Sequence, residues 1–164
     1  MAGAEDRVVA AAVAAGLDIA VRRFPEGTRT AEDAARAVGC EVAQIVKSLV
    51  FVADGQPVVA LVSGAHRLDP VRLAAALGAS VVERADGDLV REATGYAIGG
   101  VPPLGHAQSL PTVMDRALLE HEVVWAAAGR PDAVFAVTPA ELERASGAVV
   151  ADLGEEPVAG QDAG

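Results

Sequence analysis

The chain has 164 residues, a formal net charge of −10 and 52% hydrophobic but only 3% aromatic residues. This length suits a single domain whose core is built from small aliphatic side chains. The acidic charge excludes a general coat protein for nucleic acid or for an anionic membrane, because sequence-independent phosphate binding needs a basic surface. Any contact with nucleic acid must therefore be local, and we expect neither DNA nor a membrane as a partner.

The N-terminal region and the cysteine content indicate the compartment. Cys40 is the single cysteine, which permits no intramolecular disulfide and suits a reducing environment. Glu5 and Asp6 precede the apolar run at 8–17, whereas a secretory signal carries positive charge there. No apolar stretch approaches the length of a membrane span. We therefore expect a cytoplasmic protein.

Apolar spacing and capping residues predict a mixture of helices and strands. Thr30, Asp69 and Thr138 can each cap a helix, and Pro70 and Pro139 suit a first helical position. Helices are predicted at 5–16, 31–38, 70–77, 86–94 and from 139 onward, with one more helical turn at 41–45. Strands are predicted at 18–24, 46–52, 57–62, 80–83, 123–127, 133–137 and 149–150.

Turn signals connect these elements. Pro25-Glu26-Gly27 predicts a turn after the first strand, and Asp54-Gly55 between two β-rich runs predicts the clearest hairpin in the chain. Strands and helices do not alternate regularly, which favours an α+β domain with a mixed sheet. Without a repeat or a linker, residues 1–153 form one expected domain, and the acidic tail 154–164 is expected to be disordered.

A glycine- and proline-rich loop runs from Gly95 to Gly105, with the sequence GYAIGGVPPLG. Gly99-Gly100 permits positive φ and close approach of another group, while Pro102-Pro103 stiffens the rest of the loop. Such a turn can present backbone N–H groups to an anion or a developing oxyanion. The alternative is a tight turn with a structural role only.

Lys47 is the only lysine among thirteen Lys and Arg residues. A compact ammonium is thus kept at one position in a chain that otherwise uses arginine. In the predicted strand Lys47 shares a face with Ile45, Leu49 and Phe51, so its charge is costly unless paired, which makes it a site candidate. The alternative is a strand-end lysine that extends to water.

Other chemistry-bearing residues form weaker patterns. Ser63, His66 and Asp69 could suggest a nucleophilic triad, although a triad is defined in space and not by closeness in sequence. Cys40 and the three histidines (His66, His106 and His121) lack metal-ligand spacing, so we expect no metal. The glycine loop matches neither the dinucleotide nor the Walker pattern.

Three segments in this order resemble the landmarks of the YbaK/EbsC family. They are Thr30-Ala31-Glu32-Asp33-Ala34-Ala35, then Gln44-Ile45-Val46-Lys47-Ser48-Leu49-Val50, then the loop from Gly95 to Gly105. The resemblance covers the chain from about Val8 to Leu153. Members are relatives of the editing domain of bacterial prolyl-tRNA synthetase and hydrolyse mischarged aminoacyl-tRNAs.

The resemblance implies an α+β fold with a mixed, mainly antiparallel, barrel-like sheet and flanking helices, and neither metal nor cofactor. It implies that Lys47 is the family's key lysine and that Gly99, Gly100, Val101 and Pro102 form its substrate loop. Ser48 stands where cysteine-removing members often carry threonine and alanine-removing members asparagine. With the unfamiliar Gly129-Arg130-Pro131-Asp132 segment, this leaves the amino acid open.

Ester chemistry fits these residues. An aminoacyl-tRNA ester is activated, so a site needs to hold the carbonyl, stabilise an oxyanion and admit water. Amides near Gly99 and Gly100 would donate to the oxyanion, and Lys47 would fix the terminal phosphate or polarise the ester. Ser48, Val101, Pro102, Gly129 and Arg130 are assigned to substrate binding.

We therefore expect a deacylase acting in trans on mischarged tRNA(Pro) through its acceptor end, helped by prolyl-tRNA synthetase or an elongation factor. Arg22, Arg23 and Arg29 are candidate phosphate contacts, with a solvated rim as the alternative. A non-catalytic aminoacyl- or nucleotide-binding module of the same fold, and a serine hydrolase using Ser63 and His66, stay open as alternatives.

Overall fold

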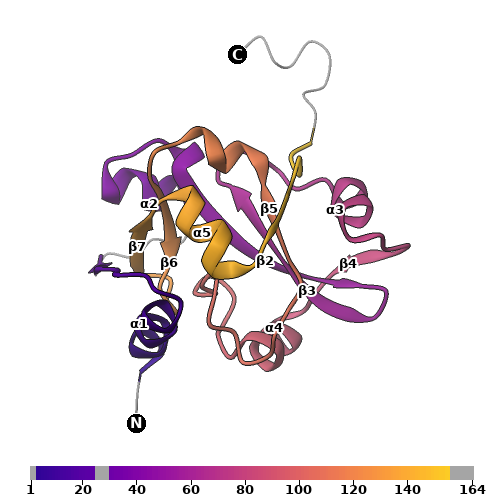
Figure 1. Ribbon diagram of the computed structural model, residues 1–164, viewed down its shortest axis with the longest axis horizontal. Coiled ribbons are helices and arrows are strands. Elements are labelled where there is room, and N and C mark those ends of the chain that lie inside the picture. The colour runs from indigo at the N-terminus through magenta and orange to yellow at the C-terminus, as the bar shows by residue number, and fades with distance from the viewer. Residues whose placement is uncertain (1–2, 25–29, 156–164) are drawn as a thin grey trace.

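A mixed sheet runs through the centre of the molecule, and the computed structural model describes residues 3–24 and 30–155 (Figure 1). Within these residues the sheet has eight strands in the order β1-β7-β6-β2-β3-β5-β8, with β4 paired to β2 outside this path. The strands are β1 (Val21–Arg23), β2 (Ile45–Ala53), β3 (Gln56–Ser63), β4 (Val82–Arg84), β5 (Thr112–Asp115), β6 (Val124–Ala127), β7 (Ala133–Val137) and β8 (Val149–Ala151).

The long β2–β3 hairpin forms where Asp54-Gly55 predicts it. Asp54 and Gly55 both have positive φ, at 48° and 84°, which suits a two-residue hairpin turn. The Asp54 carboxylate also accepts the backbone N–H groups of Ser80 and Val81 at 2.8–3.1 Å. These bonds lower the pKa of Asp54 and bring the chain before β4 to the tip of the hairpin.

The helices begin and end close to the predicted residues. They are α1 (Ala4–Ala14), α2 (Ala31–Val38), α3 (Pro70–Leu77), α4 (Gly87–Thr94) and α5 (Pro139–Ser146), with 3₁₀ turns η1 (Val42–Gln44) and η2 (Arg116–Glu120). The side chains of Thr30, Asp69 and Thr138 accept N–H groups of the first turns of α2, α3 and α5.

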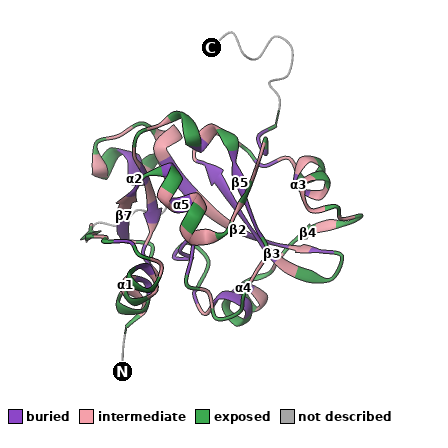
Figure 2. Ribbon diagram, viewed as in Figure 1, coloured by how far each residue is buried: buried purple, intermediate pink, exposed green. Residues whose placement is uncertain are grey.

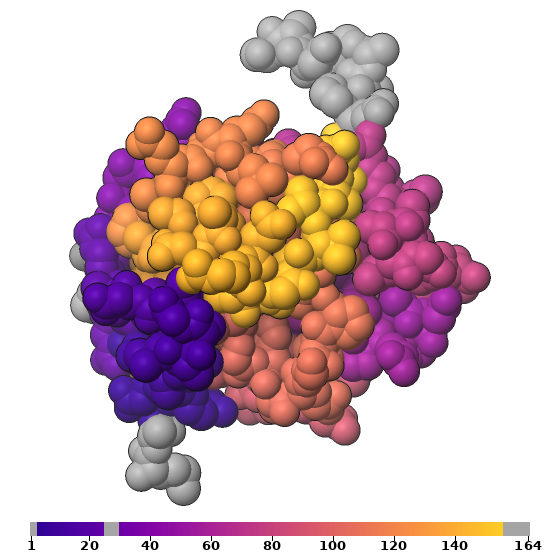
Figure 3. All heavy atoms as spheres, viewed as in Figure 1, coloured from indigo at the N-terminus to yellow at the C-terminus, as the bar shows by residue number. Residues whose placement is uncertain are grey.

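The helices cover both faces of the sheet. Val8 of α1 and Leu142 of α5 pack with Leu61 on one face of β3. Leu73 of α3 packs with Val62 on the other face. Ala34 and Ala35 of α2 form a separate cluster with Ile45 at the start of β2. Figure 2 shows the buried sheet between helices whose outer sides are exposed, and Figure 3 shows α5 and the β8 segment covering the front between α1 and α3.

The sheet is interrupted along one edge of β2. The opposite edge of β2 pairs with β3 continuously from Val46 to Ala53. On the interrupted edge, β6 pairs with β2 only at Ile45–Val46, and β4 pairs only at Phe51–Ala53. In the described part of the chain, residues 47–50 therefore have no neighbouring strand on that side.

The prediction of a mixed, mainly antiparallel α+β fold is confirmed, with four antiparallel and three parallel strand pairs among the described residues. Two elements were not predicted, β5 and η2. Order also extends past Leu153, because Gly154 bridges to Leu68 and the N–H of Glu155 donates to the carbonyl of Arg67. The predicted turn at 25–27 and the remaining tail lie outside the described residues.

Candidate active site

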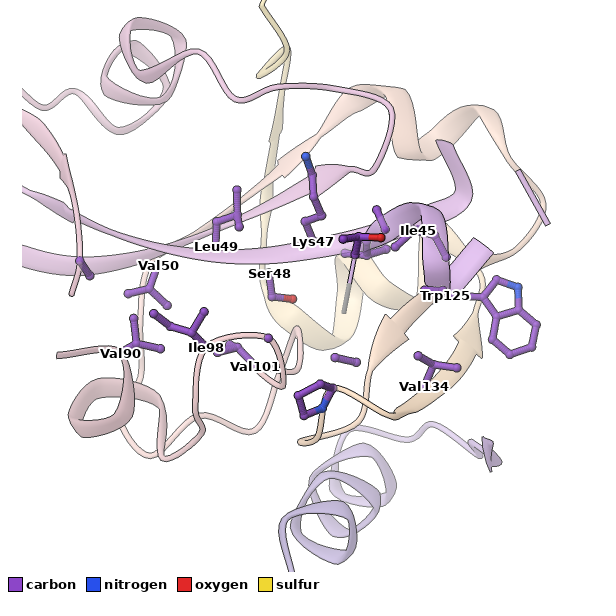
Figure 4. Close-up of a pocket in the computed structure, with 18 of the residues that line it drawn as sticks. Ile45, Lys47, Ser48, Leu49, Val50, Val90, Ile98, Val101, Trp125 and Val134 are labelled. Carbon is purple, nitrogen blue, oxygen red and sulfur yellow. The ribbon is translucent and has the colours of Figure 1, made fainter. Parts of the chain in front are cut away.

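A cavity of about 540 Å³ lies at the interrupted edge of β2 and reaches both faces of the sheet (Figure 4). Residues from β2, α2, α4, the glycine loop, the β4 end, β6 and the β6–β7 turn line it. They are Thr30, Ala31, Ala34, Ile45, Val46, Lys47, Ser48, Leu49, Val50, Phe51, Arg84, Ala85, Val90, Ile98, Gly99, Val101, Trp125, Ala127, Pro131 and Val134.

Alternation along β2 divides the cavity in two. Lys47 and Leu49 point to one side of the strand, whereas Ser48 and Val50 point to the other, toward Val101 (Figure 4). Residues on both faces line this one cavity, so its two parts are joined beside residues 47–50, where no strand of the described chain pairs with that edge of β2. A ligand placed in this gap can contact the lysine on one face and the serine on the other.

Lys47 is half-buried and its ammonium is held. Its Nζ donates to the backbone carbonyl of His66 at 2.6 Å. Burial lowers the pKa of Lys47, an effect opposed by the negative charges of Glu32 and Asp115 and reinforced by Arg84. The structure therefore disfavours the alternative of a lysine extended freely into water. One carbonyl occupies one of three ammonium donors, which leaves donors for a substrate.

The His66 carbonyl lies in a loop fixed by a buried carboxylate. Asp115 is 1% exposed, and its Oδ2 accepts the N–H of Ser63 at 3.1 Å and contacts Nδ1 of His66 at 2.8 Å. The Ser63 hydroxyl donates to the carbonyl of Ala43 at 2.8 Å. A side chain at Gly64 would lie 2.4 Å from the Val42 carbonyl oxygen, so the chain passes here only as glycine.

The same contacts contradict the serine-hydrolase alternative. Ser63 is 1% exposed and its hydroxyl is bound to a backbone carbonyl. His66 pairs with Asp115, and Asp69 instead caps α3 by accepting the N–H of Val71 at 2.9 Å. The three residues therefore do not form a triad, because each is engaged with a different partner.

Ser48 carries an unsatisfied hydroxyl. Its Oγ is the one buried side-chain oxygen or nitrogen in the described chain without a hydrogen-bond partner. The backbone of Ser48 faces the gap as well: the Val50 carbonyl on that edge accepts the N–H of Ala85, and residues two apart in a strand direct their backbone groups to the same edge. An unpaired buried polar group costs about 1–3 kcal/mol, which a substrate group could recover.

The glycine loop reaches the gap, but the two glycines differ. The Gly100 N–H donates to the carbonyl of Ala97 at 3.0 Å, so it is not free to bind an oxyanion. The oxyanion role predicted for the amides near Gly99 and Gly100 stays a prediction, and the Gly100 amide is the one already engaged within the protein. Gly99, with φ 91°, and Val101 line the cavity, and their N–H groups have no acceptor among the described residues. These two amides of the loop are therefore candidate donors to an oxyanion.

Gly100 instead allows close packing. A side chain there would lie 2.8 Å from the Gly129 carbonyl oxygen and 3.0 Å from Cα of Arg130. Gly129 and Arg130 do not line the cavity, and Arg130 pairs with Asp132 at 3.0 Å. In this structure Gly129 and Arg130 pack against the glycine loop. Their predicted contact with substrate stays a prediction. Pro131 is the residue of this turn that lines the cavity.

A buried histidine stabilises the end of the loop. Pro102 does not line the cavity, and its carbonyl accepts from Nε2 of His106 at 2.7 Å. Burial lowers the pKa of His106, which favours the neutral ring with its proton on Nε2. The predicted contact of Pro102 with substrate stays a prediction, and in this structure its carbonyl ties the loop to His106.

Sequence reasoning missed part of the lining. Ala31 and Ala34 of α2, Val90 of α4 and Trp125 of β6 reach the cavity only through the tertiary fold. Their sole sequence signals are apolar positions that any core residue would show. No group of three His, Cys, Asp or Glu side chains in the described residues could hold a metal ion. No helix described is long and apolar enough to span a membrane.

Part of the chain is similar in sequence to proline–tRNA ligases. Relatives include the proline–tRNA ligases of Citrifermentans bemidjiense, 40% identical over 92 residues, and of Maridesulfovibrio salexigens, 34% identical over 98 residues. The alignments cover 56% and 60% of this chain, and the chain spans only 16% of the length of either ligase.

A structural match extends over nearly the whole chain. The crystal structure of a protein proposed to be a trans-editing enzyme for prolyl tRNA synthetase superposes with a TM-score of 0.89 and 46% identity, covering 95% of this chain and 99% of that one. Residues 25–145 match the family described as aminoacyl-tRNA editing domain. Because this match covers most of the sequence, the protein belongs to the aminoacyl-tRNA editing domain family.

Proposed function

We propose that this protein hydrolyses the ester of mischarged aminoacyl-tRNA, and that its substrate is tRNA(Pro) carrying a small non-cognate amino acid. Membership of the editing family supports the reaction class. Similarity to proline–tRNA ligases and to the proposed trans-editing enzyme supports tRNA(Pro) and action in trans. Prolyl-tRNA synthetase or an elongation factor is the proposed partner.

The observation that carries the proposal is the gap in the sheet beside residues 47–50. Lys47 lies on one side of this gap and the unpaired Ser48 hydroxyl on the other. The groups of an aminoacyl nucleotide follow the same order, because it has a phosphate at one end, an amino acid at the other and the ester between them. The ester would lie in the gap, with the phosphate toward the Lys47 ammonium.

Hydrolysis then needs donors and a positioned water. Water adds to the ester carbonyl carbon, and the N–H groups of Gly99 and Val101 would stabilise the oxyanion that forms. When this tetrahedral intermediate collapses, the bond between the carbonyl carbon and the ribose oxygen breaks. The ribose oxygen takes up a proton from the added water, and the free amino acid is released. A neighbouring hydroxyl of the terminal ribose would orient the water, since the described residues that line the cavity include no carboxylate and no histidine.

The lining explains why a small amino acid is proposed. Val50, Val90 and Val101 surround the Ser48 side of the cavity, with one hydroxyl among aliphatic groups. A synthetase pocket separates substrates that differ by one methylene by only about 1–3 kcal/mol, so a second, smaller pocket must remove the errors. A short side chain fits beside these valines, and the Ser48 hydroxyl can accept a hydrogen bond from the substrate amino group.

A panel of mischarged tRNAs tests the proposal. The protein is incubated with tRNA(Pro) bearing alanine, serine, cysteine, threonine or proline, and loss of the ester is followed over time. We expect faster loss for at least one small non-cognate amino acid than for proline, and slower loss with the Lys47→Ala variant. Binding of aminoacyl-tRNA without ester loss would contradict the proposal and favour a non-catalytic module.

A further inference from the structure

An arginine and two aromatic rings form a cluster beside the cavity. The guanidinium carbon of Arg22 lies 5.2 Å from the ring centroid of Phe24 and 5.4 Å from that of Trp125. Such distances are typical of cation–π contacts. Trp125 itself lines the cavity, at the end away from Val50 and Val90 (Figure 4). We call Arg22, Phe24 and Trp125 the stacking cluster.

The neighbouring arginine shows a different arrangement. Arg23 forms an ion pair with the carboxylate of Glu5, as is expected for an arginine in a chain with 23 acidic residues. Arg22 is exposed, and its contacts within the described residues are with rings. Stacking uses the face of a guanidinium, so its in-plane N–H donors stay available for a phosphate or a base edge.

The stacking cluster shares a face of the sheet with Lys47. Arg22 pairs with Val134, and Val134 pairs with Ala127, so these side chains lie on one face. Trp125, two residues from Ala127, lies on that face opposite Ile45 of β2. In the strand order, β1 is three strands from β2, or about 14 Å at the usual strand spacing.

We propose that the stacking cluster binds the unpaired nucleotides that precede the terminal adenosine at the 3′ end of tRNA. The inference rests on the proposed function, because it extends the same site outward from the ester. Proteins that bind single-stranded nucleic acid stack its bases on aromatic rings and on the plane of an arginine, since every base has a face that can stack. Positive charge here, with Lys47 and Arg84 also lining the cavity, gives an acidic protein a local contact for RNA.

Fluorescence tests the contact directly, because Trp125 is the only tryptophan in the sequence. The trinucleotide cytidine-cytidine-adenosine is titrated against a trimer of the same backbone whose first two positions lack bases. Saturable quenching by the first and weaker quenching by the second is the expected result. Equal quenching by both trimers, or by neither, would overturn the proposal.

Kinetics separate this inference from the proposed function. An aminoacyl-adenosine lacks the preceding nucleotides, whereas an aminoacyl-minihelix carries them. Relative to the wild type, Arg22→Gln should lower the ratio of kcat/KM for the minihelix over the aminoacyl-adenosine by about five- to thirtyfold, mainly through KM. If the wild-type protein hydrolyses neither ester, the proposed function fails whatever the quenching shows.

A matched control uses another exposed arginine. Arg116 lies outside the cavity and pairs with Asp152 at 3.3 Å, so Arg116→Gln makes the same chemical change away from the stacking cluster. This variant should keep the wild-type ratio. Arg22 is exposed, so its replacement should leave the fold intact, which unfolding curves of both variants would verify. A wild-type ratio in a folded Arg22→Gln protein would overturn the inference.

Discussion

At the scale of single residues, Lys47 carries the clearest expectation. Lys47→Ala should lower kcat/KM by about 10- to 100-fold, the size of a lost hydrogen bond to a charged group. Lys47→Arg should not restore activity, because a planar guanidinium cannot replace the compact ammonium held 2.6 Å from the His66 carbonyl. Single-turnover deacylation measures both, and near wild-type activity in the arginine variant would remove Lys47 from the mechanism.

The pKa of Lys47 also predicts a pH dependence. Burial lowers this pKa from 10.5, so deacylation that depends on the ammonium should decline at a pH below 10.5. The same shift means that burial of the charged form opposes folding at neutral pH. The free energy of unfolding should therefore rise as the pH increases from the folded pKa of Lys47 to 10.5, because in this interval Lys47 stays protonated only in the unfolded chain.

Ser48 should separate activity from stability. Its hydroxyl is buried without a partner, so Ser48→Ala removes a group that destabilises the free protein. We expect the free energy of unfolding in urea to stay equal or to rise by up to about 1 kcal/mol, while deacylation slows. Loss of stability would mean that the hydroxyl has a protein or water partner in the free state.

At the scale of elements, the glycine loop depends on its contact with the β6–β7 turn. A methyl group at Gly100 would meet the Gly129 carbonyl oxygen at 2.8 Å and displace the loop. Gly100→Ala should therefore stay folded but misplace the Gly99 and Val101 amides, which costs roughly 10²–10³ in kcat when an oxyanion donor is lost. Full activity in the folded variant would assign the loop a structural role only.

His106 couples the same loop to pH. Its folded pKa is lowered by burial, so below pH 6.5 the unfolded chain binds a proton that the folded chain excludes. Stability should thus be lost as the pH falls from about 6.5 toward the folded pKa. His106→Gln removes the titration, and its unfolding free energy should change less between pH 7 and pH 5. An identical pH dependence in both proteins would contradict this assignment.

At the scale of the whole molecule, elements set by local chemistry, including the β2–β3 hairpin, could be predicted from the sequence, whereas the pairing of strands distant in the chain could not. Thr30, Asp69 and Thr138 marked their helices because a cap acts within one turn. β5 was missed because its four residues pair in parallel with distant strands. The gap beside Lys47 depends on where β4 and β6 meet β2, which no local pattern encodes.

The site shows the same division. Lys47 and the glycine loop stood out through residue type, and both reach the cavity. The Gly100 amide was predicted to donate to an oxyanion, but the turn formed with Ala97 uses it. Trp125 gave no functional signal in the sequence, because its position beside Arg22 results from the pairing of β1, β7 and β6.

In the proposed complex the ester lies in the gap of the sheet, with phosphate and amino acid on opposite faces. The most direct test of this placement is a crystal structure with a 5′-phosphorylated adenosine that carries alanine through a non-hydrolysable amide. We predict the carbonyl beside Gly99 and Val101, the alanine toward Ser48 and the phosphate within hydrogen-bond distance of Lys47. An analogue bound wholly on one face, or in the hollow lined by His66 and Asp115, would contradict the account.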